Sequence, residues 1–96
     1  MPAHAREWII DFKGLRARDS MLKAIAAALE FPAHFGGNLD ALYDCLTELP
    51  LEKGRSYAIR LDNLEHGAVG DAVYTVFADA REWWADAGVS LVLVRE

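Results

Sequence analysis

Three carboxylate side chains recur at four-residue intervals in the segment 38–49. They are Asp40, Asp44 and Glu48, which would lie on one face of a helix because residues four apart are neighbours there. Paired carboxylates can act as general acid and base, or as oxygen ligands of Mg²⁺ or Ca²⁺. A catalytic pair needs a cleft that separates the two pKa values, and these cations need more oxygen atoms than Asp40 and Asp44 supply. The pattern therefore predicts no catalytic residue and no metal ligand in this row.

Other residue types with reactive side chains add no further site. Cys45 falls on the apolar side of the same predicted helix, which favours a small buried side chain over a nucleophile. His4, His34 and His66 lack the spacing of metal ligands. The glycine pair 36–37 has no lysine after it, so it is not typical of a phosphate-binding loop. We therefore expect a protein that is not an enzyme and that binds no cofactor or metal.

The carboxylate row is unfavourable for the helix that carries it. Asp44 lies one turn from Asp40, and Glu48 lies near the C-terminal end, where the helix dipole opposes a negative charge. No Lys or Arg occurs between Lys23 and Lys53, and the five acidic residues of this window account for the whole net charge of −5. Two interpretations stay open: a solvated face that keeps a small protein soluble, or a surface that binds a basic partner.

The composition is typical of one small folded domain. The chain has 96 residues, of which 53% are hydrophobic, so we expect a single domain over residues 1–96. The net charge of −5 argues against nucleic-acid binding, because phosphate contacts need Lys and Arg. No apolar run approaches the ~20 residues of a membrane span, and the first residues do not resemble a signal peptide. With one cysteine, the expected location is the cytoplasm, and we expect a monomer when the protein is free.

Hydrophobic periodicity predicts strands separated by helices. The predicted strands cover 7–12, 57–62 and 89–94, and the predicted helices cover about 19–30, 38–48 and 71–87. We expect Asp19 or Ser20 to cap the first helix and Asn38 to cap the second. Gly67 and Gly70 should interrupt the chain before the third helix. This order predicts an α/β domain with a small, mainly parallel three-stranded sheet and helices packed on it.

The predicted helix 71–87 carries two neighbouring tryptophans in different positions. Trp84 follows the apolar stripe that begins with Val73, so it should be buried. Trp83 falls off this stripe and lies one turn after Asp79. An off-stripe tryptophan either packs under a loop or anchors an interface, and both alternatives stay open at this point.

One segment is specific enough to indicate a family. Residues 31–47 read Phe-Pro-Ala-His-Phe-Gly-Gly-Asn-Leu-Asp-Ala-Leu-Tyr-Asp-Cys-Leu-Thr. This segment closely resembles the signature of the barstar family, intracellular inhibitors of secreted bacterial ribonucleases such as barnase. A weaker likeness continues through Val76 and Phe77 and through the last predicted strand. The resemblance implies a barstar-like fold of three parallel strands with helices on the sheet.

The resemblance also implies which residues would bind a partner. In the family, the loop and helix of this segment block the active site of the ribonuclease, and Asp44 matches the principal carboxylate, which occupies the phosphate pocket of the enzyme. The implied partner-binding residues are His34, Phe35, Gly36, Gly37, Asn38, Leu39, Asp40, Tyr43, Asp44, Thr47 and Asp79. Three of them differ from the family pattern, since His34 replaces a tyrosine, Tyr43 a tryptophan and Asp79 a glutamate.

The implied function is inhibition of an enzyme and not catalysis. The resemblance indicates an immunity protein of a bacterial cell that inhibits a small secreted ribonuclease of the guanyl-specific type. The carboxylate row would act as a mimic of the RNA phosphate, and the partner would be a basic protein. Because aromatic positions are replaced, we also keep the alternative of a barstar-like binding module for another basic protein that is not a nuclease.

Overall fold

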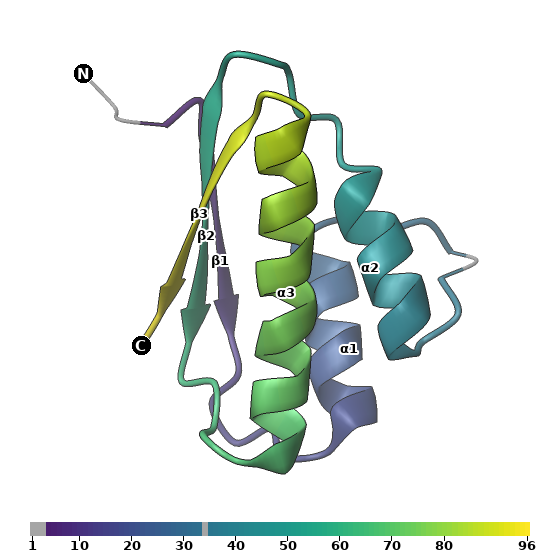
Figure 1. The fold of residues 1–96 in the computed structure, drawn as a ribbon. Helices are drawn as coiled ribbons and strands as arrows, with labels where there is room; N and C mark the ends of the chain where they lie inside the picture. Colours follow the sequence, from purple (N-terminus) through teal and green to yellow (C-terminus); the bar gives the residue numbers. More distant parts are fainter. Residues whose placement is uncertain (1–3, 34) are drawn as a thin grey trace.

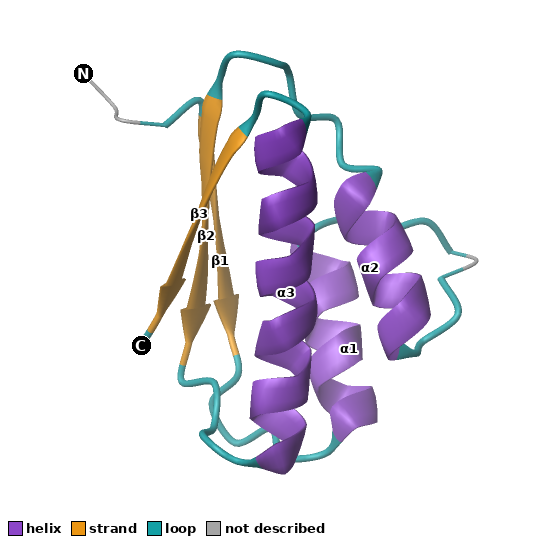
Figure 2. Ribbon diagram, viewed as in Figure 1, coloured by secondary structure: helices purple, strands orange, loops and turns teal. Residues whose placement is uncertain are grey.

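A three-stranded parallel sheet in the order β1-β2-β3 forms one layer of the structure. This computed structural model describes residues 4–33 and 35–96. The elements follow one another as β1 (Arg6–Asp11), α1 (Arg18–Ala28), α2 (Leu39–Thr47), β2 (Ser56–Asp62), α3 (Ala68–Asp86) and β3 (Ser90–Arg95) (Figure 2). The predicted α/β class with a parallel sheet is therefore confirmed.

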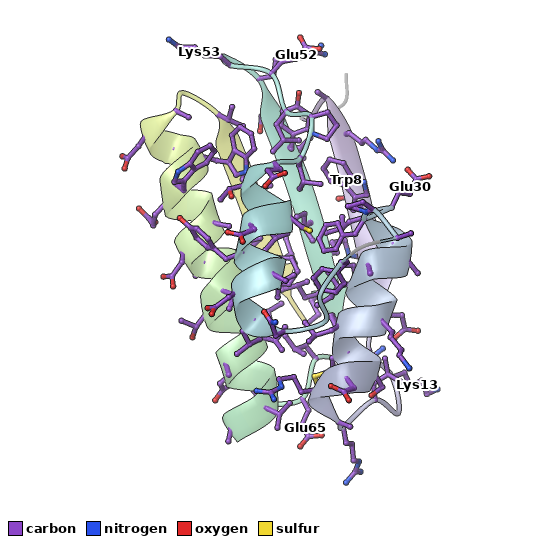
Figure 3. The ribbon with its side chains drawn as sticks, turned by 90° about the vertical axis from the view of Figure 1, so that its right-hand side faces the viewer. Trp8, Lys13, Glu30, Glu52, Lys53 and Glu65 are labelled. Carbon is purple, nitrogen blue, oxygen red and sulfur yellow. The ribbon has the colours of Figure 1, made fainter. Side chains whose placement is uncertain are left out.

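All three described helices lie on the same side of the sheet (Figure 1). α1 packs against β1 and α3 against β3, whereas α2 packs against α3. In consequence α2 is the outermost element, farthest from the strands (Figure 1). Seen from its own side, α2 lies between α3 and α1 (Figure 3), so that it presents one whole side to solvent.

The core lies between the sheet and the helices. Alternate residues of β1 are buried, as the two-residue period of a strand requires. The largest fully buried side chains come from every layer and are Phe12, Phe77, Ile10, Met21, Leu22, Ile25, Leu42, Leu46, Ile59, Leu61 and Val73. None of the described helices is long and apolar enough to cross a membrane. On the opposite face of the sheet, Ile9 is 53% exposed.

One predicted helix start, that of α3, and one predicted helix cap, that of α1, are wrong. α3 begins at Ala68, ahead of the predicted start at Asp71, and Gly70 lies in its first turn. A Cβ added at Gly70 would collide with the carbonyl oxygen of Glu65. Glycine is thus needed for a close approach and does not interrupt the helix. The residue before α1 is Ala17, which has no side-chain hydrogen bond to the helix. Neither Asp19 nor Ser20 is the cap, since both lie inside the first turn of α1.

Candidate functional site

The start of α2 is defined by a side-chain cap. The Asn38 Oδ1 accepts a hydrogen bond from the backbone N–H of Ala41 at 2.7 Å, which confirms the predicted cap. Just before it, Gly37 has a φ of 67°, a left-handed conformation that glycine adopts without strain. The cap and the glycine turn together determine where the loop stops and in which direction each α2 side chain points.

The apolar side of α2 is held by burial and by one buried hydrogen bond. Leu42 and Leu46 are fully buried and Leu49 nearly so. The indole Nε1 of Trp84 donates to the backbone carbonyl of Leu46 at 2.9 Å. This bond satisfies a carbonyl that has no partner at the C-terminal end of a helix. It also connects the last turns of α2 and α3, a contact that the periodicity of the sequence did not predict.

The opposite side of α2 is a row of exposed carboxylates. Asp40, Asp44 and Glu48 are all exposed. Within residues 4–33 and 35–96, none of the three forms an ion pair. The unfavourable row that the sequence predicts is therefore present in the fold and is not relieved by a cation from another described element.

One flank of α2 faces α3. Further predicted partner-binding residues lie there, beside the carboxylate row. Tyr43 and Thr47 are half-buried, and the Thr47 hydroxyl is directed to its own helix, 3.0 Å from the backbone carbonyl of Tyr43 and 3.2 Å from that of Asp44. Asp79 is exposed on α3, the helix against which α2 packs. The predicted partner-binding residues of α2 and Asp79 are thus on adjacent helices.

The other flank of α2 borders a hollow of about 340 Å³. Its wall is formed by the end of α1, the following loop and α2. The rings of Phe31 and Phe35 meet there with their centroids 5.2 Å apart. Cys45 lines the hollow and is half-buried, so the prediction of a buried cysteine holds only in part. Burial, followed by the charges of Glu48 and Asp44, raises the pKa of the Cys45 thiol, which disfavours the reactive thiolate.

The predicted partner-binding residues that the structure describes lie within the segment 35–47, with one further position on α3. Gly36, Gly37, Asn38, Asp40, Asp44 and Asp79 are exposed, whereas Phe35, Leu39, Tyr43 and Thr47 are half-buried. His34 lies outside the described residues. Among residues 4–33 and 35–96, no group of three or more His, Cys, Asp or Glu side chains could hold a metal ion. What this surface offers is exposed negative charge with apolar and backbone groups beside it, which suits a basic protein surface.

Comparison with known proteins gives two agreeing matches. The family model described as Barstar (barnase inhibitor) matches residues 5–96. The chain is also 34% identical over 85 residues to the protein of Bacillus subtilis (strain 168) named "Putative ribonuclease inhibitor YrdF", a match that spans 80% of this chain and 87% of that protein. Together with the parallel sheet and the order of its elements, these matches show that the chain belongs to the barstar family.

Proposed function

We propose that this protein inhibits a ribonuclease by inserting α2 and the preceding loop into the active site of the enzyme. The family to which the chain belongs is described as a barnase inhibitor, and the Bacillus subtilis relative is named as a ribonuclease inhibitor. These descriptions support a ribonuclease as the partner. The finer proposal is a small secreted ribonuclease of the guanyl-specific type, and a role in protecting the producing cell.

The observation that carries the proposal is the exposed carboxylate row without ion pairs in the described structure. An enzyme that cleaves RNA must hold a phosphate, so its active site is lined with cationic and hydrogen-bonding groups. Asp44, in the middle of the row, can accept charge-assisted hydrogen bonds from Arg, Lys or protonated His. The repulsion between Asp40 and Asp44, which costs the free protein a few tenths of a kcal/mol, would be relieved when such a partner binds.

The loop before α2 would supply the contacts that are not ionic. Gly36 and Gly37 are exposed, so their backbone is open to a partner. Phe35 is half-buried at the edge of the hollow and offers an apolar surface. We propose that residues 33–37 cover the part of the active site that recognises the RNA base, while Asp44 occupies the phosphate position. In this mechanism the protein performs no chemistry and acts by excluding the substrate.

The central test removes the Asp44 carboxylate. Wild-type protein and Asp44→Ala would be titrated against barnase, and against any secreted ribonuclease encoded beside this gene, in an RNA-cleavage assay. Removing one member of a buried charge pair costs about 3–5 kcal/mol, so the inhibition constant should rise by roughly two to four orders of magnitude.

Glu7→Ala is the matched control for this test. Glu7 is exposed on β1, in the layer opposite α2, and no ion pair of the described structure involves it. The control removes the same charge, so it should inhibit like the wild type, and circular dichroism should show that both variants fold. Equal inhibition by Asp44→Ala and Glu7→Ala would contradict the proposed mechanism.

Ionic strength gives an independent measurement. Because the net charge is −5 and the proposed partner is basic, long-range attraction should speed their encounter. Stopped-flow association rates should therefore fall as salt is raised from about 0.01 M to 1 M, over which the screening length shrinks from about 30 Å to 3 Å. An association rate that does not change with salt would argue against an electrostatically guided complex.

A second candidate is a binding module for a basic protein that is not a nuclease. Tyr43, at a position where the family resemblance expects tryptophan, is the observation that favours it, because the aromatic surface beside Asp44 is altered. An affinity capture from cells that produce this protein would distinguish the two functions. Recovery of a ribonuclease that cleaves RNA when free supports inhibition, whereas recovery of a basic non-nuclease, together with no effect on the ribonucleases above, supports the second candidate.

A further inference from the structure

The most exposed aromatic side chain among the large hydrophobic residues of the structure is Trp83 on α3. Trp83 is 44% exposed, so it is not packed under a loop, one of the two alternatives that the sequence leaves open for this residue. Isolated exposed apolar residues are common on protein surfaces. An exposed tryptophan therefore calls for an argument from its surroundings before a role is assigned.

The indole ring of Trp83 is held in place by its neighbour. It meets the ring of Trp84 edge-on, with centroids 4.9 Å apart and planes at 89°, a favourable aromatic geometry. Trp84 is itself buried and bonded to the carbonyl of Leu46 in α2. Trp83 thus rests on a residue that is anchored between the two helices, and little side-chain entropy would be lost if a partner packed on it.

Two carboxylates without ion pairs flank Trp83 on the same helix. Asp79 lies four residues before it and Asp86 three residues after it, both positions being neighbours on a helical surface. Both are exposed, and neither forms an ion pair in the part of the chain that the structure describes. The adjacent Glu82 is different, since Arg81 pairs with it at 3.6 Å.

The position of Trp83 connects this patch to the carboxylate row of α2. The bond between Trp84 and Leu46 places the last turns of α3 and α2 side by side, and both helices run in the same direction (Figure 1). Ala41 and Cys45 lie on the flank of α2 that borders the hollow. By the 100° step of a helix, Thr47 is on the other flank, which faces α3. On α3, Tyr74 lies under the guanidinium of Arg95 from β3, and nine steps of 100° place Trp83 on the opposite side of the helix, away from β3 and toward α2. The patch around Trp83 therefore continues the surface that we assign to the ribonuclease.

We propose that Trp83 is a partner-binding residue that receives an arginine side chain of the basic partner. This inference rests on the proposed function and extends its surface onto the last turns of α3. Tryptophan has the best aromatic face for a cation, and a planar guanidinium can stack on it. From that stacked position its N–H groups can reach a carboxylate on either side, Asp79 or Asp86. A second copy of this chain fits poorly, because it would bring the same carboxylates against one another.

The variant Trp83→Ala tests this proposal. Its binding would be measured to the ribonuclease that the wild type inhibits. Isothermal titration calorimetry should show an affinity about 10- to 30-fold weaker, the size expected for losing a cation–π contact that is desolvated in the complex. Trp83→Phe should retain part of the affinity because it keeps an aromatic face. Val69→Ala is the matched control, since Val69 is an exposed apolar residue near the opposite end of the same helix, and it should bind like the wild type.

The double variant Asp79→Ala with Trp83→Ala identifies the shared cation. If both residues hold one arginine, the loss in the double variant should be smaller than the product of the two single losses. Strictly multiplicative losses would show that the two residues do not hold a common side chain, and would overturn the arginine assignment.

The remaining outcomes separate this inference from the proposed function. If Asp44→Ala weakens binding and Trp83→Ala behaves like Val69→Ala, the inference is wrong and the proposed function stands. If no ribonuclease binds the wild type, or Asp44→Ala has no effect, the proposed function fails and the inference fails with it. If sedimentation shows that the free wild type is a dimer that Trp83→Ala dissociates, Trp83 is a contact between copies and the inference is also wrong.

Discussion

The carboxylates of this protein differ in their partners at two places in the fold. At the edge of the sheet where the strands end, near Glu65 in Figure 3, each of four carboxylates has a partner. Arg95 donates to Asp71 at 2.7 Å, Arg60 contacts Asp62 and Glu96 at 3.2 and 3.5 Å, and Asn63 donates to Asp11 at 2.9 Å. On α2 and the outer side of α3, Asp40, Asp44, Glu48, Asp79 and Asp86 have no ion pair within the described residues.

This difference separates charges that stabilise the fold from charges that are available to a partner. Arg95 shows the first kind, because its side chain is only 15% exposed and it also donates to the carbonyl of Glu65 and lies over the ring of Tyr74. Asp44 shows the second kind, since it lies beside like charges and gains no stabilising ion pair from the described chain. A sequence selected for stability alone would have placed a base next to Asp44.

The largest expected effect on stability comes from the buried apolar side of α2, opposite the carboxylate row. Leu46 is fully buried where α2 packs on α3, so Leu46→Ala should lower the free energy of unfolding by about 2–5 kcal/mol, through lost burial and the cavity left behind. Urea denaturation would measure this. Val69→Ala, at an exposed site, should change stability by less than about 0.5 kcal/mol. Similar values for the two variants would mean that α2 is not held by its apolar side.

The next largest effect on stability is expected from the ion pairs at the edge of the sheet where the strands end. Arg95→Ala removes charge-assisted hydrogen bonds and should destabilise the protein by about 1.5–3 kcal/mol. Arg16→Ala is the control, because Arg16 is exposed and no ion pair of the described structure involves it. The two variants lose the same charge, so equal midpoints in urea would refute a structural role for the Arg95 pairs.

A pH titration should show a smaller loss of folding stability, caused by the carboxylates at the same edge of the sheet. The hydrogen bond from Arg95 holds the pKa of Asp71 below its usual value of 3.8, and the hydrogen bond from Asn63 does the same for Asp11. A lowered folded-state pKa gives stability that is present above pH 3.8 and is lost as the pH falls through the lower folded-state value. Asp71→Asn should flatten this acid limb of the stability curve. Asp71→Asn should lose less stability than Arg95→Ala, because Arg95 keeps its other contacts in the Asp71 variant.

The smallest expected effect has the opposite sign and belongs to the exposed row. Asp44→Asn relieves repulsion with Asp40 and Glu48, so it should raise the free energy of unfolding by about 0.2–0.5 kcal/mol while weakening the proposed complex. Glu7→Gln, on β1, should leave stability unchanged. A stability loss in Asp44→Asn would contradict the distinction between the two regions, because it would show that the Asp44 charge supports the fold.

The sequence by itself determined what depends on neighbouring residues. Alternation and helical spacing predict every described strand and helix to within a few residues. Asn38 is predictable as a cap because its oxygen bonds a backbone group only three residues away. The segment 31–47 likewise indicated the family, since its motif is contiguous. These signals are local, and a local signal needs no knowledge of the rest of the chain.

Only the tertiary structure decided how distant segments meet. The sequence predicts a break at Gly70, but Gly70 lies in the first turn of α3, where only glycine fits because the carbonyl of Glu65 occupies the place of a side chain. The bond from Trp84 to Leu46 joins residues 38 apart, and it decides which flank of α2 faces α3 and which borders the hollow. The exposure of Trp83 is also decided by the packing of α3 against its neighbours. Each of these facts depends on packing between elements, which periodicity along one helix cannot report.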